Sequence, residues 1–296
     1  MTHEFPSYET IKVDIADHVA HVVLNRPEKR NAMSKAFWVE FPDAINRISN
    51  NAAARVIVVS STGKHFTAGM DLAVFAEAGN SIMGGKIDPH IHAEDFRIHL
   101  NHLQETFSSL YNARQPVLAA IQGGALGAGV DLSSACDMRY CTADAFFTIQ
   151  EVNIGMVADV GTFPRVLRQL PDGVIRELAY TGRKLEATEA LERGFVNQVF
   201  ETQDEMLAGV MEIAQQIARN SPLAVAGSKH IMNYAADHST EDTLRYIQAL
   251  NAGILSPAHM MESAAAKMQK REPVYPDVKA VNGPWDRKQR KPQTRD

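Results

Sequence analysis

The stretch from Ile121 to Phe147, IQGGALGAGVDLSSACDMRYCTADAFF, joins apolar runs through turns of small residues. The run over 116–121 predicts a strand, and the glycines after it predict a tight turn into a short helix over 127–135. Two more strands are predicted over 137–141 and 146–149. This order of elements predicts an α/β fold, with the helix packed on a sheet.

The preceding segment repeats the same order of elements. Runs of β-branched residues over 11–15 and 19–24 flank a short polar turn and predict a hairpin. A helix is predicted from Ser34, whose hydroxyl can cap it, to about residue 48, followed by a buried strand over 55–60. Apolar residues three to four apart predict an amphipathic helix over 94–112. A recurring strand-strand-helix unit predicts successive turns of one layered core.

The character of the chain changes near residue 202. A short helix over 188–193 ends at Gly194, and the last predicted strand covers 195–200. Every later predicted element is a helix, with ranges 203–219, 222–236, 241–253 and 257–270. Two of these helices start at Ser-Pro pairs, which place a capping hydroxyl before a proline. We therefore expect a core over 1–202, a helical segment over 203–275 and a flexible basic tail over 276–296.

The helical segment carries much apolar surface. Its methionines stand at 206, 211, 232, 260, 261 and 268. A segment of this kind either folds back on the core or packs against other subunits, because exposed apolar patches favour association. We expect both, and therefore an oligomer.

Composition excludes several classes of protein. The chain has 296 residues, of which 45% are hydrophobic and 22% charged, so it is neither a miniature scaffold nor wholly disordered. Its net charge of −5 gives no global positive field for nucleic acid or an anionic membrane. The tail over 287–295 is the exception, with five basic residues in nine, and is interpreted as a solvated end or a binding tail.

Two features bear on the cellular compartment. Cys136 and Cys141 are the only cysteines and form no CxxC motif, so we expect reduced core residues. The first residues, MTHEFP, lack the basic end and apolar run of a signal peptide, and no stretch is long and apolar enough for a membrane span. We expect a cytoplasmic protein that does not bind membranes.

Two small-residue turns each follow a buried strand. The glycine cluster over 123–129 matches neither GxGxxG nor a GxxxxGK[ST] loop, which argues against nucleotide binding of those kinds. The second turn covers 65–72. Each turn is either a bare turn or a source of one free amide, and two converging amides form an oxyanion hole.

Three acidic residues lie near these turns: Asp131, Glu151 and Asp159. Asp131 alone can complement a helix dipole, and Glu151 alone can be a surface acid at a strand end. Asp159 stands in the mostly apolar run 155–161, where burial raises the pKa of a carboxyl group. Carboxyl groups that share an apolar pocket can supply an acid and a base at neutral pH.

Four runs together carry a resemblance to a known family: FTAGMDL at 66–72, the quoted stretch at 121–147, QEVNIGMVADVGT at 150–162 and TGRKLEATEALERGFVNQVF at 181–200. The chain resembles the crotonase superfamily of enoyl-CoA hydratases and isomerases over nearly its whole length. Within it, the chain is most similar to the Δ3,5-Δ2,4-dienoyl-CoA isomerases. The resemblance implies a crotonase-type ββα spiral core with a C-terminal helical segment that forms trimers.

The resemblance also implies roles for the acids. Hydratases carry two glutamates that handle water, and these positions fall at Asp131 and Glu151, while hydratases typically have glycine at the position of Asp159. The triplet Asp131, Glu151 and Asp159 is that of a dienoyl-CoA isomerase, which moves two double bonds and needs no water. We expect conversion of 3,5-dienoyl-CoA to 2,4-dienoyl-CoA in the β-oxidation of unsaturated fatty acids. Glu151 is assigned to C2, Asp159 to C6, and Asp131 to tuning the other two.

By the same resemblance, the backbone amides of Met70 and Ala128 form the oxyanion hole, although relatives usually have glycine at the position of Ala128. Coenzyme A, as part of the substrate, is expected to contact Lys29, Arg30, Ala68, Asp71, Leu72 and Lys270. No separate cofactor and no metal are expected. The partners are expected to be an acyl-CoA and further copies of the chain, as a homotrimer or a hexamer of two trimers.

Other interpretations remain open at this point. The chain is alternatively an enoyl-CoA hydratase, an enzyme of other crotonase-type acyl-CoA chemistry, or a non-catalytic binding protein of the same fold, for RNA as in some relatives. Four histidines at 90, 92, 99 and 102 suggest either a metal site or a pocket rim. Because acid and thiolate ligands at matching spacing are missing, we interpret them as surface or rim residues.

Overall fold

A computed structural model describes residues 5–71, 73–74 and 88–281. Its main sheet has the strand order β1-β2-β3-β4-β6-β9, in which only the β1–β2 hairpin is antiparallel. These strands are β1 Ile11–Ala16, β2 Val19–Leu24, β3 Val56–Ser61, β4 Val117–Ile121, β6 Met138–Thr142 and β9 Gln198–Phe200. A smaller sheet joins β5 Gly124–Leu126, β7 Phe146–Thr148 and β8 Leu185–Glu186.

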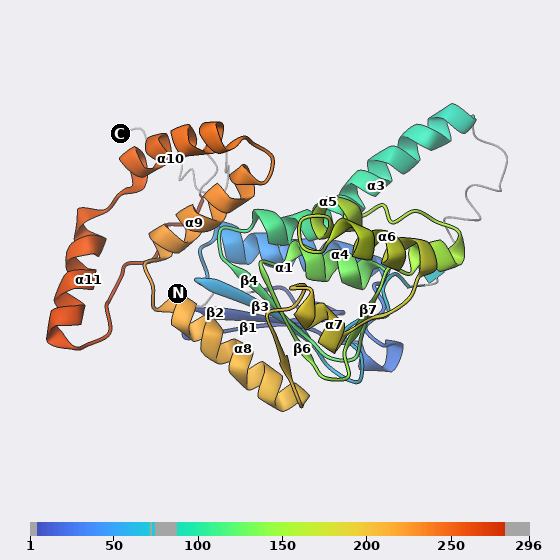
Figure 1. The fold of residues 1–296 in the computed structure, drawn as a ribbon, viewed down its shortest axis with the longest axis horizontal. Helices are drawn as coiled ribbons and strands as arrows, with labels where there is room; N and C mark the ends of the chain where they lie inside the picture. The colour runs from blue at the N-terminus through green and yellow to red at the C-terminus, as the bar shows by residue number, and fades with distance from the viewer. Residues whose placement is uncertain (1–4, 72, 75–87, 282–296) are drawn as a thin grey trace, which may run out of the picture.

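Helices cover both faces of the main sheet. The helices of the core are α1 Lys35–Asn50, α3 Pro89–Asn112, α4 Ala128–Ala135, α5 Thr162–Val166, α6 Asp172–Thr181, α7 Ala187–Glu192 and α8 Gln203–Ala218. Figure 1 shows α8 on one face, with α1 and α3 on the other. Alternate residues of β3 follow this division, because Ile57 and Val59 pack in the larger core while Val56 and Val58 pack against α8. The predicted burial of this strand on both faces is confirmed.

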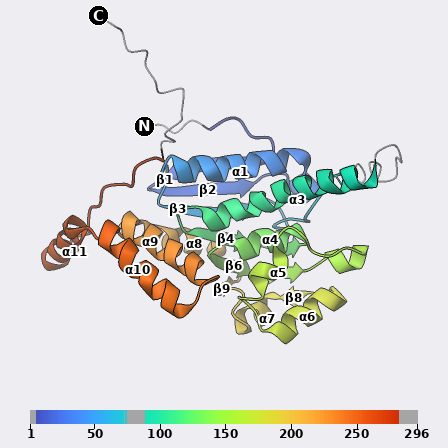
Figure 2. The ribbon, with the colours of Figure 1, turned by 90° about the horizontal axis from the view of Figure 1, so that it is seen from above.

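The remaining helices extend from the sheet: α9 Pro222–Ala235, α10 Thr240–Ile254 and α11 Pro257–Gln269. Figures 1 and 2 show them on the side of the molecule away from α5 and α6. The predicted caps are confirmed, because Ser221 accepts from the amide of Ala224 and Ser256 accepts from that of His259. The division at residue 202 remains a prediction; α8, which follows it, packs on β3 and β4.

Most predicted elements are present, with some changes. The run 124–126 forms β5, where only a turn was predicted, and α3 begins at Pro89 instead of 94 because the Asp88 carboxylate accepts from the amide of His90. The predicted cap at Ser34 is wrong. Ser34 stands at the N-cap of α1, but its buried hydroxyl has no hydrogen-bond partner among the described residues.

The start of the expected flexible tail lies against the core. Arg55 donates to the carboxylate of Asp277 at 2.6 Å and to the carbonyl of Tyr275 at 2.8 Å. Arg114 donates to the carbonyl of Lys279 at 2.9 Å. The basic run over 287–295 lies outside the described residues.

Both cysteines are free and buried, as predicted. No helix in the described part of the chain combines the length and apolar character needed to span a membrane. Within the ranges that the structure describes, no cluster of three or more His, Cys, Asp or Glu residues could hold a metal ion.

Candidate active site

The two small-residue turns meet. Thr67 donates its amide to the carbonyl of Gly124, and Leu126 donates its amide to the carbonyl of Thr67. Gly69, with a φ of 80°, makes the contact possible, because a Cβ there would lie 2.6 Å from the Leu126 carbonyl oxygen. The same Cβ position is 3.5 Å from the amide nitrogen of Ala128. The turns predicted to act together are therefore neighbours in space.

This contact leaves two amides for a ligand. The amide of Met33 donates to the carbonyl of Gly69, and the carbonyl of Met33 accepts from the amide of Asp71. The amide of Met70, between Gly69 and Asp71, takes no part in this pairing. In the turn over 123–129, Gly127 donates its amide to the carbonyl of Thr148, and Val130 donates its amide to the carbonyl of Gly127. The amide of Ala128 takes no part in this bonding. In the backbone bonding among described residues, the N–H groups of Met70 and Ala128 thus have no acceptor. Two such donors close together can stabilise a developing oxyanion.

Glu151 lies against the turn over 123–129. It follows β7 and opens the 3₁₀ helix η2 Glu151–Ile154. A Cβ on Gly127 would come within 3.1 Å of its Oε1, and the φ of 50° at this position also favours glycine. Its Oε2 is buried and has no partner among the described residues. Burial raises the pKa of Glu151, and the negative charge of Asp159 adds to the rise.

Asp131 lies in the first turn of α4 and is fully buried. The Thr162 hydroxyl donates to its Oδ1 at 2.7 Å, whereas its Oδ2 has no partner among the described residues. Burial raises the pKa of Asp131 to about 7, the charge of Glu151 adds to the rise, and the Thr162 hydrogen bond opposes it. Asp131 is therefore a carboxyl group poised between its neutral and ionised forms near neutral pH.

Asp159 completes the group from the segment before α5. Its backbone carbonyl accepts from the Gln104 side-chain amide of α3 at 2.7 Å. Its side chain is half-buried, and burial raises the pKa of Asp159. The charge of Asp159 also raises the pKa of both Glu151 and Asp131. Three mutually interacting carboxyl groups beside two free amides can exchange protons at more than one carbon of a bound thioester.

Comparison with known proteins identifies the family of this chain. The profile of the enoyl-CoA hydratase/isomerase family matches residues 14–278. The chain belongs to the enoyl-CoA hydratase/isomerase family.

Members of the family include close relatives of this chain. The mitochondrial Δ(3,5)-Δ(2,4)-dienoyl-CoA isomerase of Mus musculus is 43% identical over 268 residues, which cover 90% of this chain and 81% of that one. The peroxisomal protein of that name from Arabidopsis thaliana is 37% identical over 276 residues, covering 93% and 99%. The crystal structure of an enoyl-CoA hydratase from Bacillus anthracis matches with a TM-score of 0.80 at 30% identity, covering 93% and 100%. The predicted crotonase-type fold is confirmed.

The residues expected to bind coenzyme A in this enoyl-CoA hydratase/isomerase are partly brought together. Ala68 donates its amide to the carbonyl of Arg30 at 2.9 Å, and the neighbouring Lys29 is exposed. Asp71 lies 3.8 Å from the Arg26 guanidinium of the same loop. These residues therefore lie together at the turn over 65–72, and Leu72 lies outside the described residues.

Lys270 is not brought to this group within one chain. It is the C-cap of α11, which lies apart from α4 and α5 in Figures 1 and 2. The four histidines of the sequence analysis all lie on α3. Among the described residues, these histidines form no cluster with other histidine, cysteine or acidic residues that could hold a metal ion.

Three residues next to the carboxyl groups were not predicted: Gln104, Thr162 and Arg165. Gln104 and Thr162 form hydrogen bonds with residues 55 and 31 positions away along the chain. The positive charge of Arg165 acts on the carboxyl group of Asp131. Thr162 ends the run QEVNIGMVADVGT, but a lone threonine carries no local signal for a hydrogen bond to a residue 31 positions earlier.

Proposed function

We propose that this member of the enoyl-CoA hydratase/isomerase family converts a 3,5-dienoyl-CoA thioester to the 2,4-dienoyl-CoA. The observation that carries the proposal is the gathering of Asp131, Glu151 and Asp159, each with a raised pKa, beside the amides of Met70 and Ala128. The relatives from Mus musculus and Arabidopsis thaliana bear the name of this isomerase.

The proposed mechanism gives these groups the roles that the family resemblance implies. The thioester carbonyl accepts from the amides of Met70 and Ala128, so that loss of a C2 proton gives a stabilised dienolate. Glu151 takes the proton from C2, and the double bonds shift from C3 and C5 to C2 and C4 as Asp159 delivers a proton to C6. One proton leaves and one arrives, so no water is consumed. Asp131 tunes the charge of the other two carboxyl groups.

The proposal extends to substrate binding and assembly. Lys29 and Arg30 are exposed beside Ala68 and Asp71, and their charges suit the phosphates of coenzyme A. No further cofactor is required by the proton transfers. We further propose a homotrimer or a hexamer of two trimers, supported by exposed apolar side chains on α9, α10 and α11, at Met232, Leu244, Leu255, Met260, Met261 and Met268.

A cytoplasmic location remains a proposal supported by the free cysteines, whereas the two relatives are named as mitochondrial and peroxisomal. Fractionation of cells that express the full-length chain with a C-terminal tag tests it. Recovery in an organelle fraction would overturn this part of the proposal.

An isomerase assay tests the proposed function directly. Synthetic 3,5-dienoyl-CoA substrates of several chain lengths are mixed with the protein, and the absorbance of the conjugated product is followed. Asp159→Asn is compared with Asp204→Asn, an exposed acid in the first turn of α8. Asp159→Asn is expected to lower kcat by more than about 10²-fold, as for loss of a general acid or base. A change of less than threefold in a folded protein would show that the three-acid mechanism is wrong.

The hydratase alternative has its own outcome. The protein from Bacillus anthracis is named an enoyl-CoA hydratase. The resemblance implies that Asp131 and Glu151 fall at the two positions at which hydratases carry their acids. If crotonyl-CoA is hydrated faster than a 3,5-dienoyl-CoA is isomerised, the chain is a hydratase. Salt-dependent RNA binding without affinity for coenzyme A would instead favour the non-catalytic interpretation.

A further inference from the structure

Thr162 is the residue whose side chain forms a hydrogen bond with the buried carboxyl group of Asp131. It is the first residue of α5, is fully buried, and follows Gly161, whose φ is 125°. Its hydroxyl donates to Oδ1 of Asp131 at 2.7 Å. This is the one hydrogen bond that the Asp131 carboxyl group receives from the side chains of the described residues. A buried carboxyl group is therefore held by a single donor.

The hydrogen bond makes the two oxygens of Asp131 unequal. Oδ1 accepts the hydroxyl proton of Thr162, so it is the oxygen that carries no proton of its own when the bond is formed. Oδ2 is buried and has no partner among the described residues. The Oε2 of Glu151 is likewise buried and has no partner among the described residues. A proton that Asp131 gains or loses is thus directed to Oδ2.

We propose that Thr162 is a positioning residue of the isomerase site, which fixes the orientation of the Asp131 carboxyl group and restricts its proton exchange to Oδ2. Its part in isomerisation rests on the proposed function. Its hold on Asp131 does not, because that follows from the contact alone.

The charged groups around Asp131 set the direction of the effect. Glu151 from η2 and Asp159 from the loop before α5 favour the neutral carboxyl group, and Arg165 of α5 favours the ionised one. The guanidinium of Arg165 lies over Gly161 and donates to the Ser108 hydroxyl at 3.1 Å. Loss of the Thr162 hydroxyl removes a donor that favours the ionised form, so the pKa of Asp131 rises further.

Four variants separate the hydroxyl from the rest of the side chain. Thr162→Val keeps the shape and removes the hydroxyl, and Thr162→Ser keeps the hydroxyl. Thr162→Ala and Thr162→Ser form a second pair that differs only in the hydroxyl oxygen. Thr106→Val is the matched control, because Thr106 is a fully buried threonine of α3 whose hydroxyl donates to the carbonyl of His102.

The first readout needs no substrate. The carboxyl band of Asp131 is followed by infrared difference spectroscopy against pH and assigned with Asp131→Asn. Thr162→Val is expected to move this titration up by about 0.5–1 pH unit, the equivalent of one lost hydrogen bond. Thr162→Ser and Thr106→Val are expected to titrate with the wild type. A wild-type titration in Thr162→Val would overturn the proposal.

The second readout is the pH profile of isomerisation. The limb that reports Asp131 is expected to move to higher pH in Thr162→Val, with kcat lowered and KM unchanged, and to return in Thr162→Ser. A lowered melting temperature without a moved titration would assign Thr162 a structural role only. Failure of Thr162→Val and Thr162→Ala to fold, while Thr162→Ser folds, would likewise leave Thr162 with a structural role only. A moved titration in a protein that does not isomerise 3,5-dienoyl-CoA would leave the hold on Asp131 standing and overturn the proposed function.

Discussion

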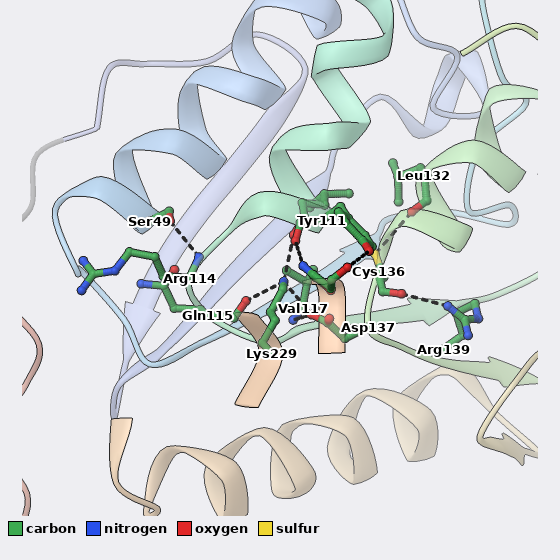
Figure 3. Close-up of polar contacts among 12 residues, drawn as sticks. Ser49, Tyr111, Arg114, Gln115, Val117, Leu132, Cys136, Asp137, Arg139 and Lys229 are labelled. Carbon is green, nitrogen blue, oxygen red and sulfur yellow. Dashed lines mark hydrogen bonds and ion pairs between the residues drawn. The ribbon is translucent and has the colours of Figure 1, made fainter. Parts of the chain in front are cut away.

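The ammonium group of Lys229 on α9 donates to Oδ2 of Asp137 at the start of β6, across 2.8 Å. Figure 3 shows the cluster around this pair. Lys229 also donates to the carbonyls of Leu110 at 3.0 Å and Gln115 at 2.9 Å, and it is only 3% exposed. Besides Pro222, it is the one buried residue of α9, so a lysine contributes to the attachment of this helix to the core. Burial lowers the pKa of Lys229, and the charge of Asp137 opposes that shift.

Removal of this ammonium group is expected to destabilise the fold. Lys229→Met keeps the length of the side chain but removes the donor to the carbonyls of Leu110 and Gln115. Asp137 loses its charged donor and keeps the amide of Val117, which donates to its Oδ2 at 2.7 Å. The ammonium group of Lys229 is buried but the side chain of Asp137 is 25% exposed, so we expect a cost of about 1.5–3 kcal/mol, the range for hydrogen bonds to charged groups. Urea unfolding of Lys229→Met is compared with that of Lys267→Met, an exposed lysine of α11. A loss below about 1 kcal/mol would mean that the pair does not anchor α9.

Gln104 is expected to act on catalysis through the loop that carries Asp159. Its side-chain amide donates to the carbonyl of Asp159, so Gln104→Leu frees the loop without changing any carboxyl group. We expect kcat to fall on the order of tenfold, because small displacements of a reacting group are costly, while KM stays near that of the wild type. The matched control is Gln203→Leu, whose amide donates to the carbonyl of Ser61. Equal kcat values for the two variants would contradict the prediction.

The fold could be predicted where local sequence patterns decide it. The β1–β2 hairpin, the buried strand β3 and the four C-terminal helices follow from β-branched runs, apolar spacing and capping residues. The strand β5 could not, because three residues with two small side chains form a strand only through pairing with β7 and the bridge from Thr67. The run over 155–161 indicates a buried acid at Asp159 but does not predict the helix α5 that follows it.

Asp159 could be predicted as a site residue because an acid in an apolar run is unusual in a sequence, whereas Asp131 and Glu151 took their roles from the family resemblance. The partners of these carboxyl groups could not be predicted. Thr162 and Gln104 contact residues 31 and 55 positions away, and neither residue type is unusual at its position. The sequence also offers Ser34 as a cap, but its hydroxyl has no partner among the described residues.

The contrast between two N-cap residues can be measured. Thr202 accepts from the amide of Glu205 at the start of α8, so Thr202→Ala is expected to lower the free energy of unfolding by about 1 kcal/mol. Ser34→Ala removes a buried hydroxyl without a partner, and is expected to change it by less than about 0.5 kcal/mol. Urea unfolding of the two variants side by side tests this. A larger loss in Ser34→Ala would show that its hydroxyl does cap α1.

The exposed apolar side chains of the last helices are expected to lie between subunits. Leu255 and Met261 are 64% and 67% exposed, and both lie at or within the C-terminal helices that leave the sheet. Leu255→Glu and Met261→Glu are expected to shift a trimer toward smaller species in analytical ultracentrifugation, because a charge is costly in an apolar contact. Tyr180→Glu is the control, since Tyr180 is 69% exposed on α6, away from these helices. A monomeric wild type would overturn the proposed assembly.

Asp131 is expected to make the stability of the protein depend on pH in a defined direction. Burial raises the pKa of Asp131 to about 7, above its ordinary value of 3.8, so the folded chain keeps a proton that the unfolded chain has released. The stabilisation from this proton is present at low pH and is lost as the pH rises through about 7. Asp131→Asn keeps an acceptor for the Thr162 hydroxyl but has no proton to lose. Between about pH 5 and pH 8.5, the wild type is therefore expected to lose about 2–3 kcal/mol more stability than Asp131→Asn in urea unfolding. Parallel pH dependence of the two proteins would show that Asp131 keeps its ordinary pKa, and with it that the carboxyl group is ionised throughout the neutral range.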